Sequence, residues 1–439
     1  MADTAGGRTA GMADTDATHV VTVFLRNDAD VLLLRRSDEV GSYSGRWGAV
    51  AGHAEGDPDG AAREEIREET GLDPQSRVTL VRRGNSFEVV DEDLDTRWVV
   101  HPYLFDARRR EVTTNDETTE HEWAPPTAIL RRETVPELWR SYDRVRPTVE
   151  AVAEDREHGS SYLSLRALEH LRDEAALGVE RDATDWDALA ATARDLREAR
   201  PSMVVVANRV NRVMHAACEA SSPAAVERAA TEAIDRALAA DERAATRAAE
   251  RLPDRVATLS RSGTVLAALA AADPDSVLVA ESRPGREGVD AAAEIASRTD
   301  AAVTVTTDAA FGERLAEDAD ALLVGADAVL PDGRVVNKVG TRGAVAAAAA
   351  EGADCYVVTT SDKVRPEGDD GGDASFDREE RDPSAVYDGD AEVSVANPTF
   401  GATPTERFDA VVTEDGTLDS EGIRAVAAAH RRRAAWDEV

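Results

Sequence analysis

Cysteine and lysine are nearly absent from this chain of 439 residues. The only cysteines, Cys218 and Cys355, stand far apart, which excludes a framework of disulfides and the paired spacing of a zinc motif. The only lysines are Lys338 and Lys363, so arginine carries almost all of the positive charge. Neither disulfide bonds nor structural zinc is therefore expected to hold this protein together.

Long apolar runs are also missing from the sequence. No stretch approaches the roughly 18 apolar residues that a helix needs to span a bilayer. Residues 1–18 are polar, small and acidic, and they lack the charged and then apolar layout of a secretory signal. We therefore expect a cytoplasmic protein with no membrane partner and with a disordered tail over residues 1–18.

Positive charge is scarce relative to negative charge. The chain has 51 Lys and Arg against 86 Asp and Glu, a net charge of −35 at pH 7. Because this field repels phosphate backbones, no direct binding to nucleic acid is expected. The hydrophobic share of 42% is that of a globular protein, so the acidic residues are expected on the surface. Such a surface is typical of a halophilic protein, and a codon bias toward Ala, Arg, Gly and Asp is the alternative explanation.

A chain of this length is expected to form two or three domains, and the first is predicted over residues 19–150. Runs of β-branched and apolar residues over 20–25 and 31–34 predict a hairpin. A loop with several glycines follows, and then a helix over 59–70 that Gly71 ends. The rest of this domain is predicted to form strands over 78–82, 87–90 and 98–105 and a helix near 134–145.

The remainder of the chain changes character twice. Residues 151–254 carry leucines and alanines at helical spacing and are predicted to form a helical subdomain. From residue 255 to 439, apolar strand-like runs alternate with helical ones, which predicts a parallel sheet covered on both faces. The predicted strands are 256–259, 277–280, 303–306, 321–324, 355–359 and 408–412. A loop rich in Pro, Gly and Asp over 366–383 is expected before the last strand.

Three carboxylates of the first domain share one face of the predicted helix over 59–70. Glu65, Glu68 and Glu69 stand at positions i, i+3 and i+4, and they repel one another unless water or a cation neutralises them. Oxygen ligands of this kind suit Mg²⁺ or Mn²⁺. A solvated acidic helix is the alternative in so acidic a chain. The glycine-rich loop before the helix and the sequence Thr-Gly-Leu after it favour the metal site.

The segment from Gly52 to Leu72 resembles the Nudix box, Gly-x5-Glu-x7-Arg-Glu-U-x-Glu-Glu-x-Gly-U, in which U is a bulky aliphatic residue. Besides Gly52, the matching positions are Glu65, Ile66, Glu68, Glu69, Gly71 and Leu72. The resemblance covers about residues 19–147 and implies the α/β/α sandwich of that family. It also implies that Glu65, Glu68 and Glu69 are catalytic and hold Mg²⁺ or Mn²⁺. The expected reaction is hydrolysis of a nucleoside diphosphate linked to another group.

This segment departs from the Nudix box in two ways. Glu64 stands where an arginine is expected, and Arg63 and Arg67 are the neighbouring candidates to replace it. The loop is two residues shorter than the pattern, and Asp57 stands near the position of the first glutamate. Because the arginine orients the neighbouring glutamate, its loss is expected to loosen the metal site.

Polar motifs follow several strands predicted for the last domain. Ligands of an open parallel sheet bind beyond the carboxyl ends of the strands, so these motifs are expected to converge. Arg261, Arg283 and Lys338, together with helix N-termini, predict an anion site. The segment from Asn337 to Thr341, which contains Lys338, is expected to open the next helix. The alternative is that Arg261 and Arg283 pair with local carboxylates.

These motifs resemble the family that unites regulatory subunits of translation initiation factor 2B with two sugar-phosphate isomerases. The matching segments are Arg200-Pro201-Ser202, Thr258-Leu259-Ser260-Arg261-Ser262, Glu281-Ser282-Arg283-Pro284, Val324-Gly325-Ala326-Asp327, Asn337-Lys338-Val339-Gly340-Thr341 and Asn397-Pro398-Thr399-Phe400. The resemblance covers about residues 155–430 and implies a helical subdomain, a Rossmann-like domain, and a homodimer or higher oligomer. The residues that it implies for binding a sugar phosphate or nucleotide are Arg200, Ser260, Arg261, Ser262, Arg283, Asp327, Asn337 and Lys338.

One position separates the two branches of that family. The isomerases use a cysteine and an aspartate; Asp327 matches the aspartate, but Ser260 stands where the cysteine is expected. A hydroxyl is far less acidic than a thiol, and neither Cys218 nor Cys355 is placed to replace it. We therefore expect a Nudix phosphohydrolase fused to a ligand-binding domain. The alternatives are a regulatory protein without catalysis and, ranked last, an isomerase of the ribose-1,5-bisphosphate type.

Overall fold

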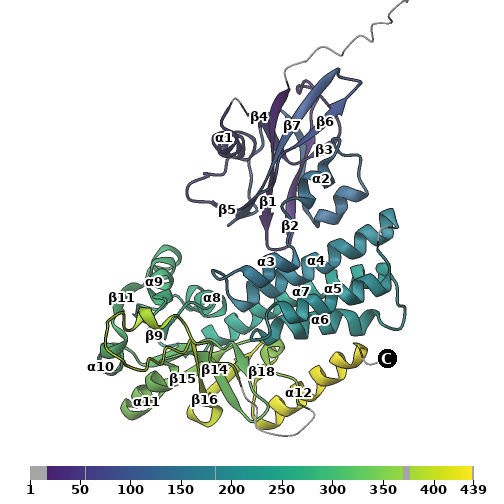
Figure 1. The fold of residues 1–439 in the computed structure, drawn as a ribbon. Helices are drawn as coiled ribbons and strands as arrows, with labels where there is room; N and C mark the ends of the chain where they lie inside the picture. The colour runs from purple at the N-terminus through teal and green to yellow at the C-terminus, as the bar shows by residue number, and fades with distance from the viewer. Residues whose placement is uncertain (1–16, 55, 183, 369–375, 438–439) are drawn as a thin grey trace, which may run out of the picture. The chain divides into compact units, whose positions relative to one another are not determined.

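A computed structural model describes residues 17–54, 56–182, 184–368 and 376–437 (Figure 1). The chain divides into two compact units, residues 1–146 and 147–439, each described here by itself. Most of the predicted tail over 1–18 lies outside the described residues. So do residues 369–375 of the loop predicted over 366–383. Among the described residues, no helix is both long and apolar enough to cross a membrane.

The first unit is built on one mixed sheet of eight strands. The central path runs β3-β2-β1-β7-β5, and β4, β6 and β8 pair with β1, β7 and β2. β1 and β7 are parallel, and every other pair with described partners is antiparallel. The strands are β1 (Thr18–Asn27), β2 (Asp30–Arg36), β3 (Trp47–Gly48), β4 (Val50–His53), β5 (Val78–Arg83), β6 (Phe87–Asp91), β7 (Thr96–Ala107) and β8 (Thr118–Ala124).

Two local features of this unit agree with the sequence analysis. The predicted hairpin is formed by β1 and β2, with Asn27 opposite Asp30 and a tight turn between them. The predicted helix is α1 (Pro58–Thr70), and it ends at Gly71, whose φ of 67° suits glycine. The remaining helices of the unit are α2 (Leu138–Asp143) and the 3-10 turn η1 (Pro126–Leu130). The core under α1 contains Ile66 with Val21, Val23 and Phe105.

The second unit begins with helices, as the sequence predicts. Long α4 packs against α6 and α7, and its buried face carries Leu163, Leu168 and Leu171. The helices are α3 (Val149–Glu154), α4 (Ser160–Arg181), α5 (Trp186–Ala199), α6 (Val204–Ala217) and α7 (Pro223–Ala249). Together they form the helical layer of the unit (Figure 1).

A seven-stranded sheet of order β11-β10-β9-β12-β15-β17-β18 follows, parallel except for the last strand. Its strands are β9 (Arg255–Leu259), β10 (Ser276–Ala280), β11 (Ala302–Thr306), β12 (Ala321–Val324), β15 (Asp354–Val358), β17 (Ala410–Thr413) and β18 (Gly416–Thr417). Its helices are α8 (Gly263–Ala272), α9 (Glu287–Arg298), α10 (Asp308–Asp318), α11 (Thr341–Glu351) and α12 (Ser420–Ala434). The order reverses between β9 and β12, which creates a crevice beyond the ends of these strands.

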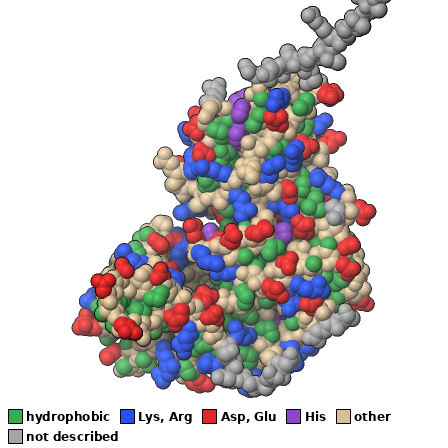
Figure 2. All heavy atoms as spheres, viewed as in Figure 1, with side chains coloured by type: hydrophobic (Ala, Val, Ile, Leu, Met, Phe, Trp, Pro, Cys, Tyr) green, Lys and Arg blue, Asp and Glu red, His purple; other side chains and the backbone are tan. Residues whose placement is uncertain are grey.

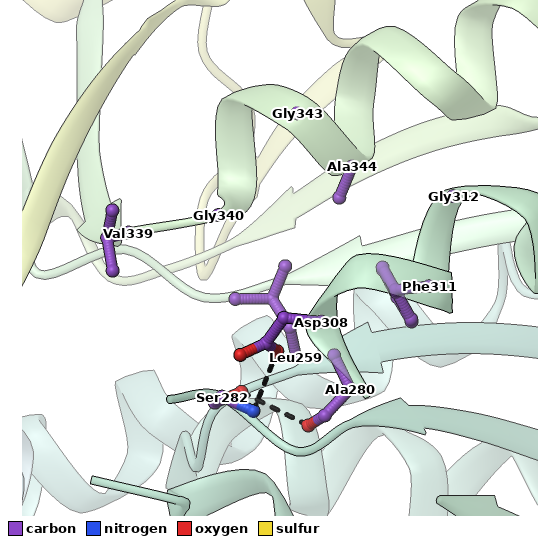
Figure 3. A pocket seen from close by; sticks show the side chains of 10 residues that line it. All are labelled: Leu259, Ala280, Ser282, Asp308, Phe311, Gly312, Val339, Gly340, Gly343 and Ala344. Atoms are coloured by element: carbon purple, nitrogen blue, oxygen red, sulfur yellow. Dashed lines mark hydrogen bonds between the residues drawn. The ribbon is translucent and has the colours of Figure 1, made fainter. Parts of the chain in front are cut away.

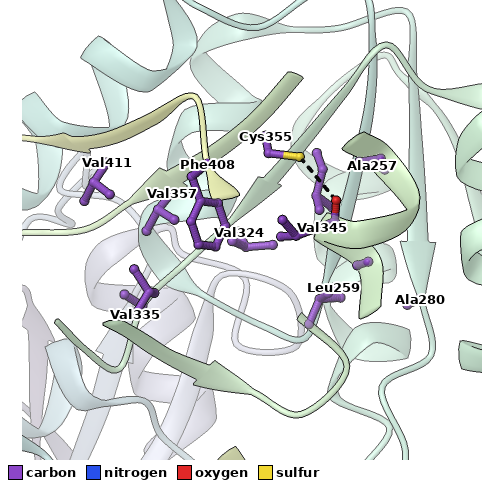
Figure 4. Packing of buried hydrophobic residues seen from close by; sticks show 14 of the residues in the cluster. Ala257, Leu259, Ala280, Val324, Val335, Val345, Cys355, Val357, Phe408 and Val411 are labelled. Carbon is purple, nitrogen blue, oxygen red and sulfur yellow. Dashed lines mark hydrogen bonds between the residues drawn. The ribbon is translucent and has the colours of Figure 1, made fainter. Parts of the chain in front are cut away.

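Alternate residues of the strands pack on opposite faces of this sheet, as a pleated strand requires. Leu322 packs with residues of α10, α11 and α12, whereas Leu323 packs with residues of α7, α8 and α9. Figure 4 shows the first of these clusters, with Val324, Val345 and Phe408. Both faces of the sheet are therefore covered, and the chain has an α/β multidomain fold.

A small antiparallel sheet was not predicted from the sequence. It consists of β13 (Ala328–Val329), β14 (Arg334–Lys338) and β16 (Phe400–Pro404), in the order β13-β14-β16. The segment from Asn337 to Thr341 was expected to open a helix, and α11 does begin at Thr341, while Lys338 is the last residue of β14. The strands are short and pair across 62 residues, from Lys338 to Phe400, so no local pattern announced them.

Charged side chains are spread over the visible surface. Figure 2 shows Asp and Glu side chains scattered over the described residues, with Lys and Arg side chains among them. Many of the exposed pairs are i,i+3 or i,i+4 contacts such as that between Arg314 and Glu317 at 3.0 Å. Exposed pairs of this kind add little stability, so the two cores carry the fold.

Candidate functional sites

Helix α1 positions the predicted catalytic glutamates of the first unit. The Asp57 side chain caps its start by accepting a hydrogen bond from the Gly60 N–H at 3.1 Å. Asp57 therefore caps the helix instead of standing beside Glu65 and Glu69. Ala62 and Ile66 anchor the buried face of the helix, and this face also carries Glu69, which is 5% exposed.

Glu65 and Glu69 form a pair of carboxylates against β4. A Cβ atom at Gly52 would lie 1.7 Å from Glu65 Oε1, so only glycine permits this approach. The Ala51 N–H donates to Glu69 Oε1 at 3.4 Å. Burial and the charge of Glu68 raise the pKa of Glu65 to about 7. Burial and the charge of Glu65 raise the pKa of Glu69 to about 8.

The arginines expected to replace the missing one do not neutralise this pair. Arg63 donates to the Pro74 carbonyl at 3.2 Å, and its guanidinium lies 5.6 Å from the centre of the Phe105 ring. Arg67 is exposed near the helix end. Within the described residues, neither Glu65 nor Glu69 has an ion pair with arginine or lysine. The pair therefore keeps protons to a higher pH than ordinary carboxylates do, and, of the described charges, only that of Arg36 acts against the rise in the pKa of Glu69.

The three predicted metal ligands are not gathered into one ready cluster. Across the described parts of the chain, no group of three or more His, Cys, Asp or Glu side chains is placed to hold a metal ion. Glu68 is exposed, whereas Glu65 is half-buried and Glu69 is buried. The carboxylate oxygens of Glu65 and Glu69 are nevertheless the ligand type that Mg²⁺ or Mn²⁺ prefers. A hard cation would also remove the repulsion that contributes to both raised pKa values.

In the second unit, the reversal of strand order brings two predicted motifs together. Ser260 and Ser262 follow β9, and Gly325 follows β12. A Cβ atom at Gly325 would lie 2.7 Å from Ser262 Oγ, so the two loops are in contact. Ser260 has a φ of 62°, and its N–H donates to Ser282 Oγ at 2.7 Å. The Ser260 loop is thus fixed to the loop after β10.

A cavity of about 310 Å³ opens beside these loops. It is lined mainly by small and apolar groups, among them Leu259, Ser282, Phe311, Val339 and Gly343 (Figure 3). One side carries Asp308, whose carboxylate accepts the N–H groups of Ser282 and Arg283 at 2.8 and 2.6 Å. None of the eight residues predicted for ligand binding lines the cavity itself. Three of the eight, Ser260, Arg283 and Lys338, are adjacent in the sequence to residues that line the cavity.

The predicted cations of this unit go to different partners. Arg261 pairs with Glu294 at 3.0 Å, as the alternative to an anion site anticipated. Lys338 is 8% exposed, and its Nζ lies 2.7 Å from Glu287 Oε1. Arg381, which the sequence analysis did not single out, reaches the same oxygen at 2.8 Å. The neighbour of Lys338, Asn337, is buried and donates to Thr341 Oγ1 at 3.0 Å.

The charges of Lys338 and Lys363, the two lysines of the chain, both act on Asp327. Burial raises its pKa, and the charges of Lys363 and Lys338 act against that rise. Lys363 is buried and donates to the Ala326 carbonyl at 2.8 Å. Arg200 donates to the Asp155 carbonyl, and burial and the charge of Arg156 lower its pKa. The sequence analysis did not include Lys363 in the site, although the rarity of lysine was a signal for it.

Neither cysteine replaces the missing thiol. Cys355 is buried in β15, where burial raises its pKa to about 11, and its Sγ faces the Val345 carbonyl (Figure 4). Cys218 follows α6, and its thiol donates to the His215 carbonyl at 3.1 Å. No hydrogen bond from a base to the Ser260 hydroxyl exists among the described residues.

Comparisons with known proteins agree with this architecture. The Initiation factor 2 subunit family matches residues 156–420, and the NUDIX domain matches residues 17–145. Ribose 1,5-bisphosphate isomerase of Haloferax volcanii is 32% identical over 304 residues, which cover 64% of this chain and 92% of that protein. Methylthioribose-1-phosphate isomerase of a Synechococcus species is 27% identical over 312 residues, covering 64% and 88%.

Among solved structures, translation initiation factor eIF-2B of Pyrococcus horikoshii is similar, with a TM-score of 0.52 and 26% identity. The match covers 62% of this chain and 94% of that one. This chain therefore belongs to the initiation factor 2 subunit family and carries a Nudix domain in front of it.

Proposed function

We propose that the first unit is a pyrophosphohydrolase dependent on Mg²⁺ or Mn²⁺, which cleaves a nucleoside diphosphate linked to another group. The observation that supports this most is the pair Glu65 and Glu69, which α1 holds against β4 with no direct ion pair to arginine or lysine among the described residues. Such a pair has a strong electrostatic demand for a divalent cation. The second unit would bind a phosphorylated sugar or a nucleotide, and it would assemble into dimers or larger oligomers.

Three glutamates would hold the cation. Glu65 and Glu69 supply the fixed oxygens, and the exposed Glu68 supplies a ligand that can adjust its position. The cation, when bound, would neutralise the diphosphate and lower the pKa of an attacking water. The Ala51 N–H orients Glu69, and the bare backbone of Gly52 lets Glu65 approach β4. With no arginine at position 64, orientation of Glu65 depends on this packing.

Replacement of Glu68 by glutamine is expected to abolish hydrolysis. The amide keeps the shape of the side chain but removes the charge that the cation needs, so turnover should fall at least about 100-fold. The measurement is phosphate-product release from a panel of nucleoside diphosphate-linked compounds with Mg²⁺ and with Mn²⁺. Glu92→Gln, an exposed change in the same unit, is the control. Absence of turnover in the unchanged protein across the panel would instead favour a regulatory protein without catalysis.

Stability of the first unit is expected to depend on pH through Glu69. Its pKa is about 8 in the folded protein against a usual 4.5, so the folded state holds an extra proton between these values. The contribution of Glu69 to stability is therefore full below pH 4.5 and is lost as the pH rises from there through about 8. Glu69→Gln should remove much of this loss. At pH 9 it should be more stable than the unchanged protein by up to about 5 kcal/mol, since one pKa unit corresponds to about 1.4 kcal/mol and the pKa of Glu69 is raised from 4.5 to about 8.

Hydrogen exchange of peptides from α1, measured at pH 5 and pH 9, reports this difference for the first unit alone. Saturating Mg²⁺ should restore stability at pH 9 in the unchanged protein and have no effect on Glu69→Gln. A pH profile that is the same for both proteins would show that Glu69 is not held in a carboxylate pair.

For the second unit, a phosphorylated ligand is supported by the cations near the crevice and by the cavity beside it. Lys338 and Arg381 supply charge for a phosphate. The cavity supplies space for a sugar. The names of the curated relatives describe isomerases of phosphorylated sugars, which fits this chemistry.

Filling the cavity should block the ligand without harming the fold. A Cβ atom at Gly343 would meet no atom within 4 Å, and this residue lies in α11. Gly343→Leu is expected to weaken binding of ribose 1,5-bisphosphate at least about tenfold in calorimetry. Gly343→Ala, the control, should bind normally and gain about 0.5–1 kcal/mol of stability, as alanine does over glycine in a helix. Unchanged affinity in Gly343→Leu would place the ligand elsewhere.

A second candidate for this unit is isomerisation of ribose 1,5-bisphosphate. The observation in its favour is Asp327, a buried acid with a raised pKa beside Lys363. Ser260 argues against it, because no base activates its hydroxyl. The pure protein is therefore expected not to produce ribulose 1,5-bisphosphate. Measurable conversion that Asp327→Asn abolishes would establish the isomerase instead.

A further inference from the structure

Three charged side chains that are distant in the sequence meet beside the cavity of the second unit. Lys338 ends β14, Glu287 begins α9, and Arg381 lies in the segment before β16. Lys338 Nζ and Arg381 Nη2 lie 2.7 and 2.8 Å from the same oxygen, Glu287 Oε1. Arg381 is held in place by a second hydrogen bond, from its Nε to Thr399 Oγ1 at 3.2 Å.

The charges of this cluster do not balance. Two cations converge on one oxygen of Glu287, while its other oxygen, Oε2, is buried and has no hydrogen-bond partner among the described residues. Burial alone would raise the pKa of Glu287, but the hydrogen bond and charge of Lys338, with Arg381, hold it below its usual range. Glu287 is thus an ionised carboxylate that shares one oxygen between two cations and leaves its other oxygen without a hydrogen-bond partner in the described parts of the chain.

The backbone at Gly285 lies very close to the side chains of Glu287 and Arg381. A Cβ atom at Gly285 would lie 2.3 Å from Glu287 Oε1 and 2.4 Å from Arg381 Nη1, so any other residue would disturb the contact. Glu287 follows the Ser282 loop, and Lys338 precedes Val339, while Ser282 and Val339 both line the cavity. An anionic group bound between Lys338 and Arg381 would therefore lie next to the cavity. The rest of the same ligand molecule would lie in the cavity or beside it.

We propose that Glu287 is a specificity-determining residue that occupies the phosphate position between Lys338 and Arg381. A ligand binds only when its phosphate displaces this carboxylate. A doubly charged phosphate has three oxygens to share between the two cations and can replace Glu287, whereas a neutral sugar cannot replace its charge. The inference rests on the proposed function, in which this unit binds a phosphorylated ligand. It adds that only a ligand with enough negative charge to displace the Glu287 carboxylate binds.

The test is a change of charge at Glu287 without a change of shape. Glu287→Gln should bind inorganic phosphate and ribose 1,5-bisphosphate about tenfold more tightly than the unchanged protein in calorimetry, because no internal anion competes. Arg381→Ala should bind both more weakly. Glu317→Gln, an exposed change on α10, is the matched control and should bind like the unchanged protein. Unphosphorylated ribose should bind to none of them.

Each outcome bears on a different part of the proposal. If Glu287→Gln binds phosphate as the unchanged protein does, or more weakly, Glu287 does not compete and the inference is overturned while the ligand class stands. If no variant binds either phosphate compound, the proposed function of this unit fails as well. Should Glu287→Gln fail to fold, Glu287→Asp keeps the charge but shortens its reach, and it should bind more tightly than the unchanged protein.

Discussion

Both sites depend on charge that the protein does not balance by itself. In the first unit, α1 holds Glu65 and Glu69 together against β4, and the position where the Nudix box has an arginine carries Glu64. In the second unit, Lys338 and Arg381 share one carboxylate oxygen of Glu287. Buried charge is costly unless it is paired. The first site therefore favours a cation, and the second favours an anion with more oxygens than a carboxylate has.

Features that arise within a few residues could be predicted from the sequence. The spacing of the glutamates, the Gly71 end of α1, and the alternation of strands and helices after residue 255 all follow from local periodicity. The burial of Glu69 and the exposure of Glu68 could not be predicted, because β4 decides which side of the helix is covered. Sequence spacing placed the three glutamates on one face, but it did not show that Glu68 stays exposed while Glu65 and Glu69 are partly or fully buried.

Contacts between segments that are distant in the sequence could not be predicted for the same reason. Glu287 meets Lys338 across 51 residues and Arg381 across 94 residues, and no motif joins them. The small sheet that carries Lys338 pairs short strands that lack a clear alternation. Arg261 looked equivalent to Lys338 in the sequence, yet it faces Glu294 on α9. Which cation is left to bind a ligand is decided by these tertiary partners and not by residue type.

The proposed function gives the second unit the phosphate-binding charges of a sugar-phosphate site without a nucleophile. Asp327 and the two lysines remain, whereas Ser260 has only a hydroxyl in place of the thiol. On this proposal, the unit would keep the charges that bind a phosphate and would lack the group that starts isomerisation. Membership of the initiation factor 2 subunit family is compatible with this reduction, because the similar solved structure is described as an initiation factor and the curated relatives as isomerases.

The central claim is that the carboxylates of α1 are a cation site. Crystals grown with Mn²⁺ test it most directly, because anomalous scattering locates this ion without assumptions about the reaction. The account predicts an anomalous peak between Glu65 and Glu69, with Glu68 turned toward it, and no peak in Glu69→Gln. A map in which these side chains keep the described positions and no ion lies among them would contradict it.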